Sequence, residues 1–111
     1  MSTVMVINRP QMGEGDEVLG QKLLGACLRK AANAIEDLSA IVLYNAGVKL
    51  AVRSSPLSAD LRILHERGIE VLPCGTCLEH YGLTEQLVFD RASNMEEILT
   101  TLHQARKVIT L

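Results

Sequence analysis

The sequence contains few aromatic residues, no long hydrophobic run and no cluster of basic residues. Aromatic side chains make up 3% of the 111 residues, with no tryptophan and one phenylalanine, whereas apolar residues make up 48%. The core must therefore consist of aliphatic side chains, which suits helices packed on a buried parallel sheet. The length predicts a single domain, residues 1–111, that can bury a core without disulfides or a structural metal.

These absences also exclude several classes of partner. The net charge is −2 and no basic patch forms, so we expect no nucleic-acid partner. No apolar run is long enough to span a bilayer, and the N-terminus resembles a strand rather than a signal peptide, so we expect no membrane association. The three cysteines are odd in number and lack the spacing of a disulfide framework, which is typical of a reducing compartment. The expected location is the cytoplasm.

Apolar runs alternate with helical patterns along the chain, which predicts βα units. Strands are expected at about 3–8, 40–44, 69–72 and 107–111, with a weak one at 87–89. The apolar run 69–72 shows no alternation, which is typical of a central strand covered on both faces. Helices are expected after Asp16, from Ser55-Pro56 to Gly68, from Cys77 to near Gly82, and after Ser93. Residues 48–52 fit either a short helical turn or an extended piece. The prediction is a mainly parallel sheet of about five strands with helices on both faces.

Four motifs predict where helices begin. Asp16 and Ser55 are suitable N-caps, the latter with Pro at the first helical position. Thr76 and Glu79 match a capping box, as do Ser93 and Glu96.

The strongest local feature is Cys74-Gly75-Thr76-Cys77, which follows a strand of a parallel sheet directly. Ligand sites gather at the carboxyl ends of such strands, and a helix N-terminus stabilises a thiolate. Several alternatives remain open from the residues alone: two inert buried cysteines, thiol–disulfide exchange, a metal site with His80, or sulfur transfer through a persulfide. A closed zinc site needs a fourth ligand and a c-type haem site needs His after the second Cys, where Leu78 stands. We therefore expect no metal and no cofactor.

Other residues are expected near the same strand ends. Gly13, Gly15 and Asp16 follow the first strand; their spacing fails as a dinucleotide loop and fits a tight turn with a cap. Asn45 follows the second strand, and Lys49 either reaches the cleft, where a cation would lower a cysteine pKa, or is solvated. The backbone of Gly75 and Thr76 is expected to stabilise charge on Cys74.

Five motifs in this order resemble the DsrE-like domain of YedF-type proteins of sulfur and selenium metabolism, over essentially the whole chain. They are 12–17 (MGEGDE), 44–50 (YNAGVKL), 74–78 (CGTCL), 81–83 (YGL) and 93–95 (SNM). The resemblance implies a three-layer DsrE/F-like fold, a homo-oligomer (a trimer or hexamer) and a role in sulfur relay. It places the persulfide-bearing cysteine at Cys74, with no required counterpart for Cys77.

YedF-type proteins often carry an N-terminal TusA-like domain, whereas this sequence begins at the expected first strand. We therefore expect sulfur donor or acceptor proteins, such as TusA-like ones, as separate partners. The leading hypothesis is a persulfide carrier, similar to a sulfurtransferase, with catalytic Cys74 and Cys77. Substrate binding is then expected at Gly13, Gly15, Asp16, Asn45, Lys49, Gly75 and Thr76. The alternative is a non-catalytic, oligomeric subunit that binds a small ligand or a partner at the same cleft.

Overall fold

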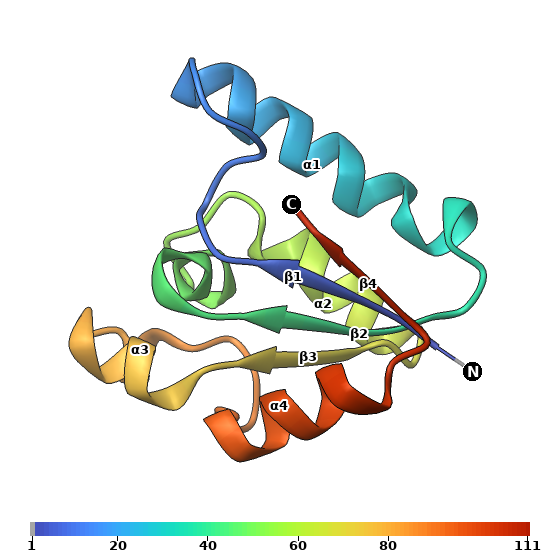
Figure 1. Ribbon diagram of the computed structural model, residues 1–111. Coiled ribbons are helices and arrows are strands. Elements are labelled where there is room, and N and C mark those ends of the chain that lie inside the picture. The colour runs from blue at the N-terminus through green and yellow to red at the C-terminus, as the bar shows by residue number, and fades with distance from the viewer. Residues whose placement is uncertain (1) are drawn as a thin grey trace.

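The fold is a four-stranded parallel sheet flanked by helices. It is seen in a computed structural model that describes residues 2–111 (Figure 1). The strands are β1 (Thr3–Ile7), β2 (Leu38–Leu43), β3 (Glu70–Pro73) and β4 (Lys107–Thr110), in the order β3-β2-β1-β4. All three strand pairs are parallel, so the carboxyl ends of the strands meet at one edge. The predicted α/β class is confirmed.

Helices cover the two faces of the sheet. The crossovers β1–α1–β2 and β2–α2–β3 step in one direction, whereas the return from β3 to β4 steps in the other. Right-handed crossovers therefore place α1 (Glu17–Ala34) and α2 (Ser58–Glu66) on one face and α4 (Met95–Gln104) on the other, as Figure 1 shows. Leu24 and Leu28 of α1, Leu61 of α2 and Ile98 of α4 are fully buried against the sheet.

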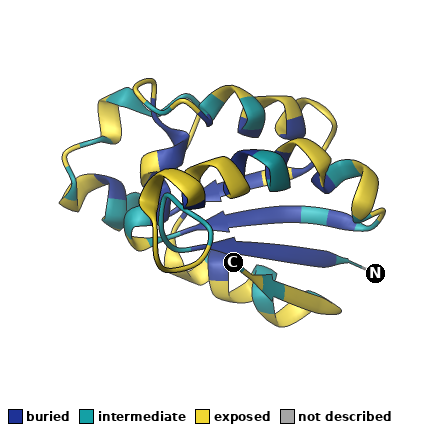
Figure 2. Cartoon of the chain, turned by 90° about the horizontal axis from the view of Figure 1, so that it is seen from above, coloured by how far each residue is buried: buried dark blue, intermediate teal, exposed yellow. Residues whose placement is uncertain are grey.

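The core is aliphatic, as the composition predicts. All five residues of β1 are buried, and so are five of the six in β2. The outer strand β4 is mostly exposed, so the buried part of the sheet lies on the β1–β2–β3 side (Figure 2). Within residues 2–111, no helix combines the length and the apolarity needed to cross a bilayer.

Two expectations about the strands are wrong. The sheet has four strands rather than about five, because residues 87–89 form only an isolated antiparallel bridge between Leu87 and Val52. The strand expected to be central, β3, lies at the sheet edge. Its apolar run still fits a buried strand, because Val71, Leu72 and Pro73 are all buried although the strand is at the edge.

Three helix starts differ from the capping motifs. Asp16 does cap α1 by accepting from the Leu19 N–H at 2.8 Å. However, α2 begins at Ser58, because Ser55 instead forms a local turn with the Leu57 N–H. The short helix α3 (Gly75–His80) has Cys74 at its N-cap position and no side-chain cap, so the Thr76–Glu79 box does not form.

The start of α4 also differs by one residue. Asn94 rather than Ser93 is the N-cap, and its side-chain oxygen accepts from the Glu97 N–H at 2.8 Å. Ser93 cannot serve, because it is buried and its hydroxyl donates to the Glu97 carboxylate at 2.5 Å.

The segment left open at residues 48–52 belongs to a 3-10 helix, η1 (Asn45–Ala51), followed by the bridge residue Val52. This helix crosses close to the end of β1. A Cβ at Gly47 would overlap the carbonyl oxygen of Ile7, so only glycine fits there. The close approach fixes Asn45 at the carboxyl edge of the sheet. A second 3-10 turn, η2 (Thr84–Gln86), follows α3.

Candidate functional site

The site begins where two neighbouring strands end. Leu43 of β2 is paired with Pro73 of β3, and the next residue on each strand is Tyr44 or Cys74. The Cys74 N–H donates to the Leu43 carbonyl oxygen at 2.9 Å, which ties the two chain segments together. Consequently η1 and α3 leave the sheet side by side, and Asn45 lies beside Cys77, as predicted from the parallel topology.

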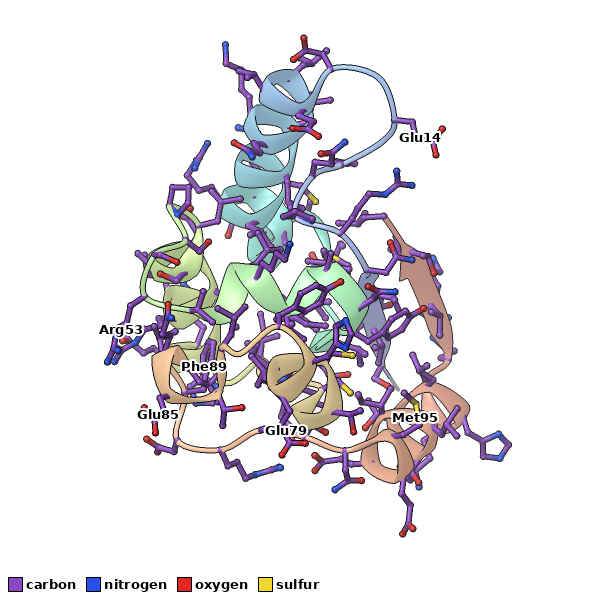
Figure 3. All side chains as sticks on the ribbon, turned by 90° about the vertical axis from the view of Figure 1, so that its left-hand side faces the viewer. Glu14, Arg53, Glu79, Glu85, Phe89 and Met95 are labelled. Carbon is purple, nitrogen blue, oxygen red and sulfur yellow. The ribbon has the colours of Figure 1, made fainter. Side chains whose placement is uncertain are left out.

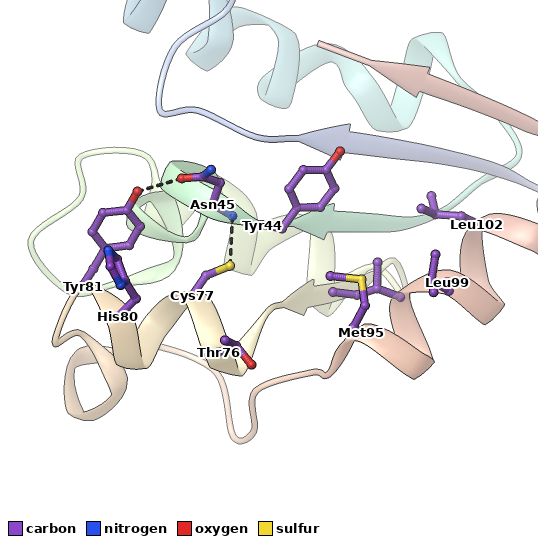
Figure 4. Close-up of a pocket in the computed structure, with 10 residues that line it drawn as sticks. Tyr44, Asn45, Thr76, Cys77, His80, Tyr81, Met95, Leu99 and Leu102 are labelled. Atoms are coloured by element: carbon purple, nitrogen blue, oxygen red, sulfur yellow. Dashed lines mark hydrogen bonds between the residues drawn. The ribbon is translucent and has the colours of Figure 1, made fainter.

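A pocket of about 600 Å³ opens between η1, α3 and α4 (Figure 4). Its lining combines a polar end with an apolar wall: Tyr44, Asn45, Thr76, Cys77, His80 and Tyr81 on one side, and Met95, Ile98, Leu99 and Leu102 of α4 on the other. No Lys, Arg, Asp or Glu side chain is among these lining residues. The pocket therefore favours a ligand or partner group with apolar surface next to the Cys77 thiol.

The two cysteines of the C-x-x-C differ in access. Cys74 is buried, with 2% of its surface exposed, and does not line the pocket. Cys77 is half-buried and lines it. All three cysteines of the chain are free thiols. A reagent in the pocket would therefore meet the Cys77 sulfur first.

The Cys77 sulfur accepts a hydrogen bond from the Asn45 backbone N–H at 3.1 Å. Burial raises the pKa of the Cys77 thiol, the Asn45 N–H lowers it, and the neighbouring Cys74 thiol raises it; the net direction is upward. The Asn45 N–H is thus the group that favours the thiolate against desolvation and against the second cysteine.

Asn45 is itself held by the end of α3. Its backbone adopts a φ of 50°, in the left-handed region. The Tyr81 hydroxyl donates to the Asn45 side-chain oxygen at 2.7 Å. Lys49, in the last turn of η1, does not line the pocket; its Nζ lies 4.6 Å from the centroid of the Tyr81 ring. Its ammonium group therefore lies over the Tyr81 ring.

The start of α3 is hydrogen-bonded to the segment before α4. The Gly75 N–H donates to the Ser93 carbonyl oxygen at 2.9 Å, and the Ser93 N–H donates to the Pro73 carbonyl oxygen at 2.6 Å. The Gly75 N–H is therefore already paired and is not free to stabilise charge on Cys74, contrary to our expectation. The Thr76 side chain reaches the pocket lining, as Figure 4 shows.

The predicted loop at Gly13, Gly15 and Asp16 is not part of this pocket. Both glycines have positive φ, and Asp16 caps α1. The loop follows β1 at the same edge of the sheet, but it projects outward. Glu14 at its tip lies at the opposite end of the molecule from Met95 of the pocket wall (Figure 3). The structure therefore brings together Asn45, Thr76 and Cys77 and separates them from this loop.

The geometry does not support a metal site formed by Cys74, Cys77 and His80. No group of three His, Cys, Asp or Glu side chains in the described part of the chain is arranged to hold an ion. His80 instead packs edge-to-face on Tyr81, with ring centroids 5.2 Å apart.

Sequence reasoning missed Tyr81 and Tyr44 as site residues, and it considered His80 only as a metal ligand. Tyr81 follows Cys77 by four positions, a spacing that puts two side chains on one face of a helix. The apolar wall belongs to the helix expected after Ser93, but a period of 3.6 does not reveal that its apolar face borders the C-x-x-C segment.

A parallel α/β domain with a thiol in a pocket at the strand ends defines a class of small thiol-bearing proteins. The model of the DsrE/DsrF-like family matches residues 1–111, and the chain belongs to that family, which is associated with sulfur relay. No curated protein sequence is significantly similar to it.

Solved structures that share this fold include the following two. The YchN protein from E. coli matches with a TM-score of 0.72 and 17% identity. That match covers 100% of this chain and 100% of the other. A protein of unknown function from Methanobacterium thermoautotrophicum, MTH1491, matches with a TM-score of 0.72 and 21% identity. That match covers 99% of this chain and 98% of the other. At these identities the likeness concerns the fold alone.

Proposed function

We propose that the protein is a sulfur-relay protein in which Cys77 carries the transferred sulfur as a persulfide and Cys74 acts as the second thiol. The observation that supports this is the position of the Cys77 sulfur, in the pocket lining and 3.1 Å from the Asn45 N–H. The resemblance places the persulfide on Cys74, but the 2% exposure of that residue argues for exchanging the two roles.

The loading step needs an accessible thiolate and a persulfide donor. The Cys77 thiolate attacks the outer sulfur of a donor persulfide, an S–S bond forms to Cys77, and the donor leaves as a thiolate. The Cys74 thiolate can then attack the Cys77 sulfur. This step forms a Cys74–Cys77 disulfide and releases hydrosulfide, and an external thiol must reduce the disulfide before the next cycle.

The raised pKa of Cys77 leaves fewer thiolates at neutral pH, but each is a stronger nucleophile. The proposed partners are donor or acceptor proteins, TusA-like ones among them. The same exchange chemistry extends to selenium, in keeping with the resemblance to YedF-type proteins.

Intact mass after incubation with a cysteine desulfurase and cysteine tests this proposal. Wild type is expected to gain the mass of one sulfur atom, and treatment with a thiol reductant is expected to remove it. Cys77→Ser is expected not to load, whereas Cys27→Ser, which alters a cysteine of α1 outside the pocket, is expected to load normally. Loading of Cys77→Ser together with failure of Cys74→Ser would restore the assignment implied by the resemblance.

A second candidate is a non-catalytic subunit that binds a small ligand. The apolar wall on α4 and the volume of about 600 Å³, which lies in the range of ligand pockets, favour it. A screen of small apolar compounds by thermal shift on Cys77→Ser would test it. Binding without the thiol supports a ligand site, and no binding in either wild type or Cys77→Ser contradicts it.

A further inference from the structure

Asn45 is the one residue other than glycine with a positive φ in the part of the chain that the structure describes. Such a conformation costs free energy for residues with a Cβ, although Asn tolerates it better than most. A residue held this way by its surroundings points to a functional constraint. A constraint of this kind is present here, because the same residue donates its backbone N–H to the Cys77 sulfur at 3.1 Å.

Two side-chain contacts hold this turn. The Tyr81 hydroxyl donates to the Asn45 side-chain oxygen at 2.7 Å, across 36 residues of sequence (Figure 4). The Lys49 ammonium lies 4.6 Å from the centroid of the Tyr81 ring, within the range of a cation–π contact. Both contacts join η1 to the end of α3, so each fixes the two segments that carry Asn45 and Cys77.

The alternative is that Tyr81 only packs there. Against it, the hydroxyl bonds a side chain whose own backbone contacts the thiol, so the bond acts on the site rather than on the core. Tyr81 is half-buried at the margin of the core, and Asn45 is exposed, so the bond between them lies outside the buried cluster of the sheet. Loss of the hydroxyl should therefore alter the thiol more than the stability of the fold.

We propose that Asn45 and Tyr81 are positioning residues for Cys77: Tyr81 anchors the Asn45 side chain, and Asn45 thereby presents its backbone N–H to negative charge on sulfur. This inference rests on the proposed role of Cys77. It applies equally to a thiolate awaiting sulfur and to the charged end of a persulfide, because both accept hydrogen bonds better than a neutral thiol does.

The test measures the pH dependence of Cys77 alkylation by iodoacetamide in a Cys27→Ala, Cys74→Ala background, where Cys77 is the only thiol. Tyr81→Phe removes the anchor, and Asn45→Gly removes the side chain while still allowing a positive φ. Each is expected to raise the alkylation midpoint by up to about one pH unit, because a hydrogen bond to a charged group is lost or loosened. Since both changes break the same bond, the double variant is expected to shift no further than either single variant.

The control is Thr3→Val, which removes a side-chain hydrogen bond of similar length, 2.8 Å to Asp37, at the opposite end of the sheet. It is expected to leave the midpoint unchanged. The proposal is overturned if Tyr81→Phe and Asn45→Gly titrate like the background chain, or if Thr3→Val shifts the midpoint as much as they do. Sulfur loading is measured separately. Shifted midpoints in a chain whose Cys77 takes up no sulfur would leave the positioning role standing and reject the proposed function.

Discussion

Cys74 and Cys77 belong to the same turn of chain, yet one is enclosed by the core and the other faces the pocket. Cys74 occupies the N-cap position of α3, where its N–H is bonded to β2 and its side chain is buried. Cys77 is the third residue of the helix and lies beside Asn45. The neighbouring Cys74 thiol raises the pKa of Cys77. This arrangement suits a reaction in which the buried Cys74 thiol attacks a persulfide carried by the accessible Cys77.

The first prediction concerns the lifetime of the persulfide. Cys74→Ala should still load sulfur on Cys77 but lose the internal attack that releases hydrosulfide, so the loaded form should persist longer than in wild type. Removing Cys74 also removes an interaction that raises the Cys77 pKa, so the alkylation midpoint should fall. Decay of the loaded mass with time, together with hydrosulfide release, measures the first effect. Equal decay in wild type and Cys74→Ala would show that Cys74 does not act on the persulfide.

The second prediction concerns the close contact that places η1. Gly47→Ala should destabilise the fold by about 3 kcal/mol, because its Cβ would overlap the Ile7 carbonyl oxygen, which belongs to a buried strand. The matched control is Gly68→Ala at the end of α2, where φ is 93° and no atom lies within 4 Å. It should cost only about 1 kcal/mol of backbone strain. Urea unfolding of both variants gives the comparison, and similar costs would contradict the role of the close approach.

The sequence predicts the fold well because the signals are local. Apolar runs and amphipathic periods place β1, β2, α1 and α4 to within a few residues, and alternation of strands and helices implies a parallel sheet. The helix starts are less predictable, since Ser93 and Asn94 both have suitable side chains. Which of them caps the helix depends on the burial of Ser93 and on its hydrogen bond to the Glu97 side chain, which leaves the Glu97 N–H to Asn94.

The site is only partly predictable for a different reason. Parallel topology puts every strand's carboxyl end at one edge, which correctly joins Asn45 to the C-x-x-C segment. It does not tell which loop folds over the edge and which projects away from it, and the Gly13–Asp16 loop projects. Nor does the spacing of the two cysteines reveal their burial, because that depends on the turn at which α3 begins. The contact between Tyr81 and Asn45 depends on tertiary structure altogether.

The third prediction concerns acid stability. Arg91 and Ser93 hydrogen-bond the Glu97 carboxylate and lower its pKa from 4.5 to about 2. Because the folded pKa is depressed, this stabilisation is complete above pH 4.5 and is lost as the pH falls toward 2. Glu97→Gln should therefore lower the free energy of unfolding at pH 7 by about 1 kcal/mol, a modest value because Arg91 is largely solvated. The difference from wild type should shrink toward pH 2.

Urea midpoints between pH 7 and pH 2.5 measure this difference. Glu96→Gln is the matched control, because Glu96 is exposed, lies on the same helix turn and has no ion pair within residues 2–111. It should change stability little at any pH. A Glu97→Gln effect that stays constant over this range would mean that the carboxylate charge is not what stabilises the segment before α4.

The last prediction is the assembly. We expect a trimer or a hexamer, and the surface offers a physical reason, because Leu99 and Met95 of α4 and Val108 of β4 are 58%, 48% and 44% exposed. Apolar side chains of this size gathered on adjacent segments mark an interaction surface. Leu99→Asp should shift the mass by light scattering toward the monomer, since a carboxylate would be buried without a partner. Ile63→Asp, at an apolar residue of α2 that is 50% exposed and lies on the opposite face of the sheet, should leave the mass unchanged. A wild-type monomer at micromolar concentration would reject the assembly, and dissociation by Ile63→Asp but not by Leu99→Asp would place the interface on the other face.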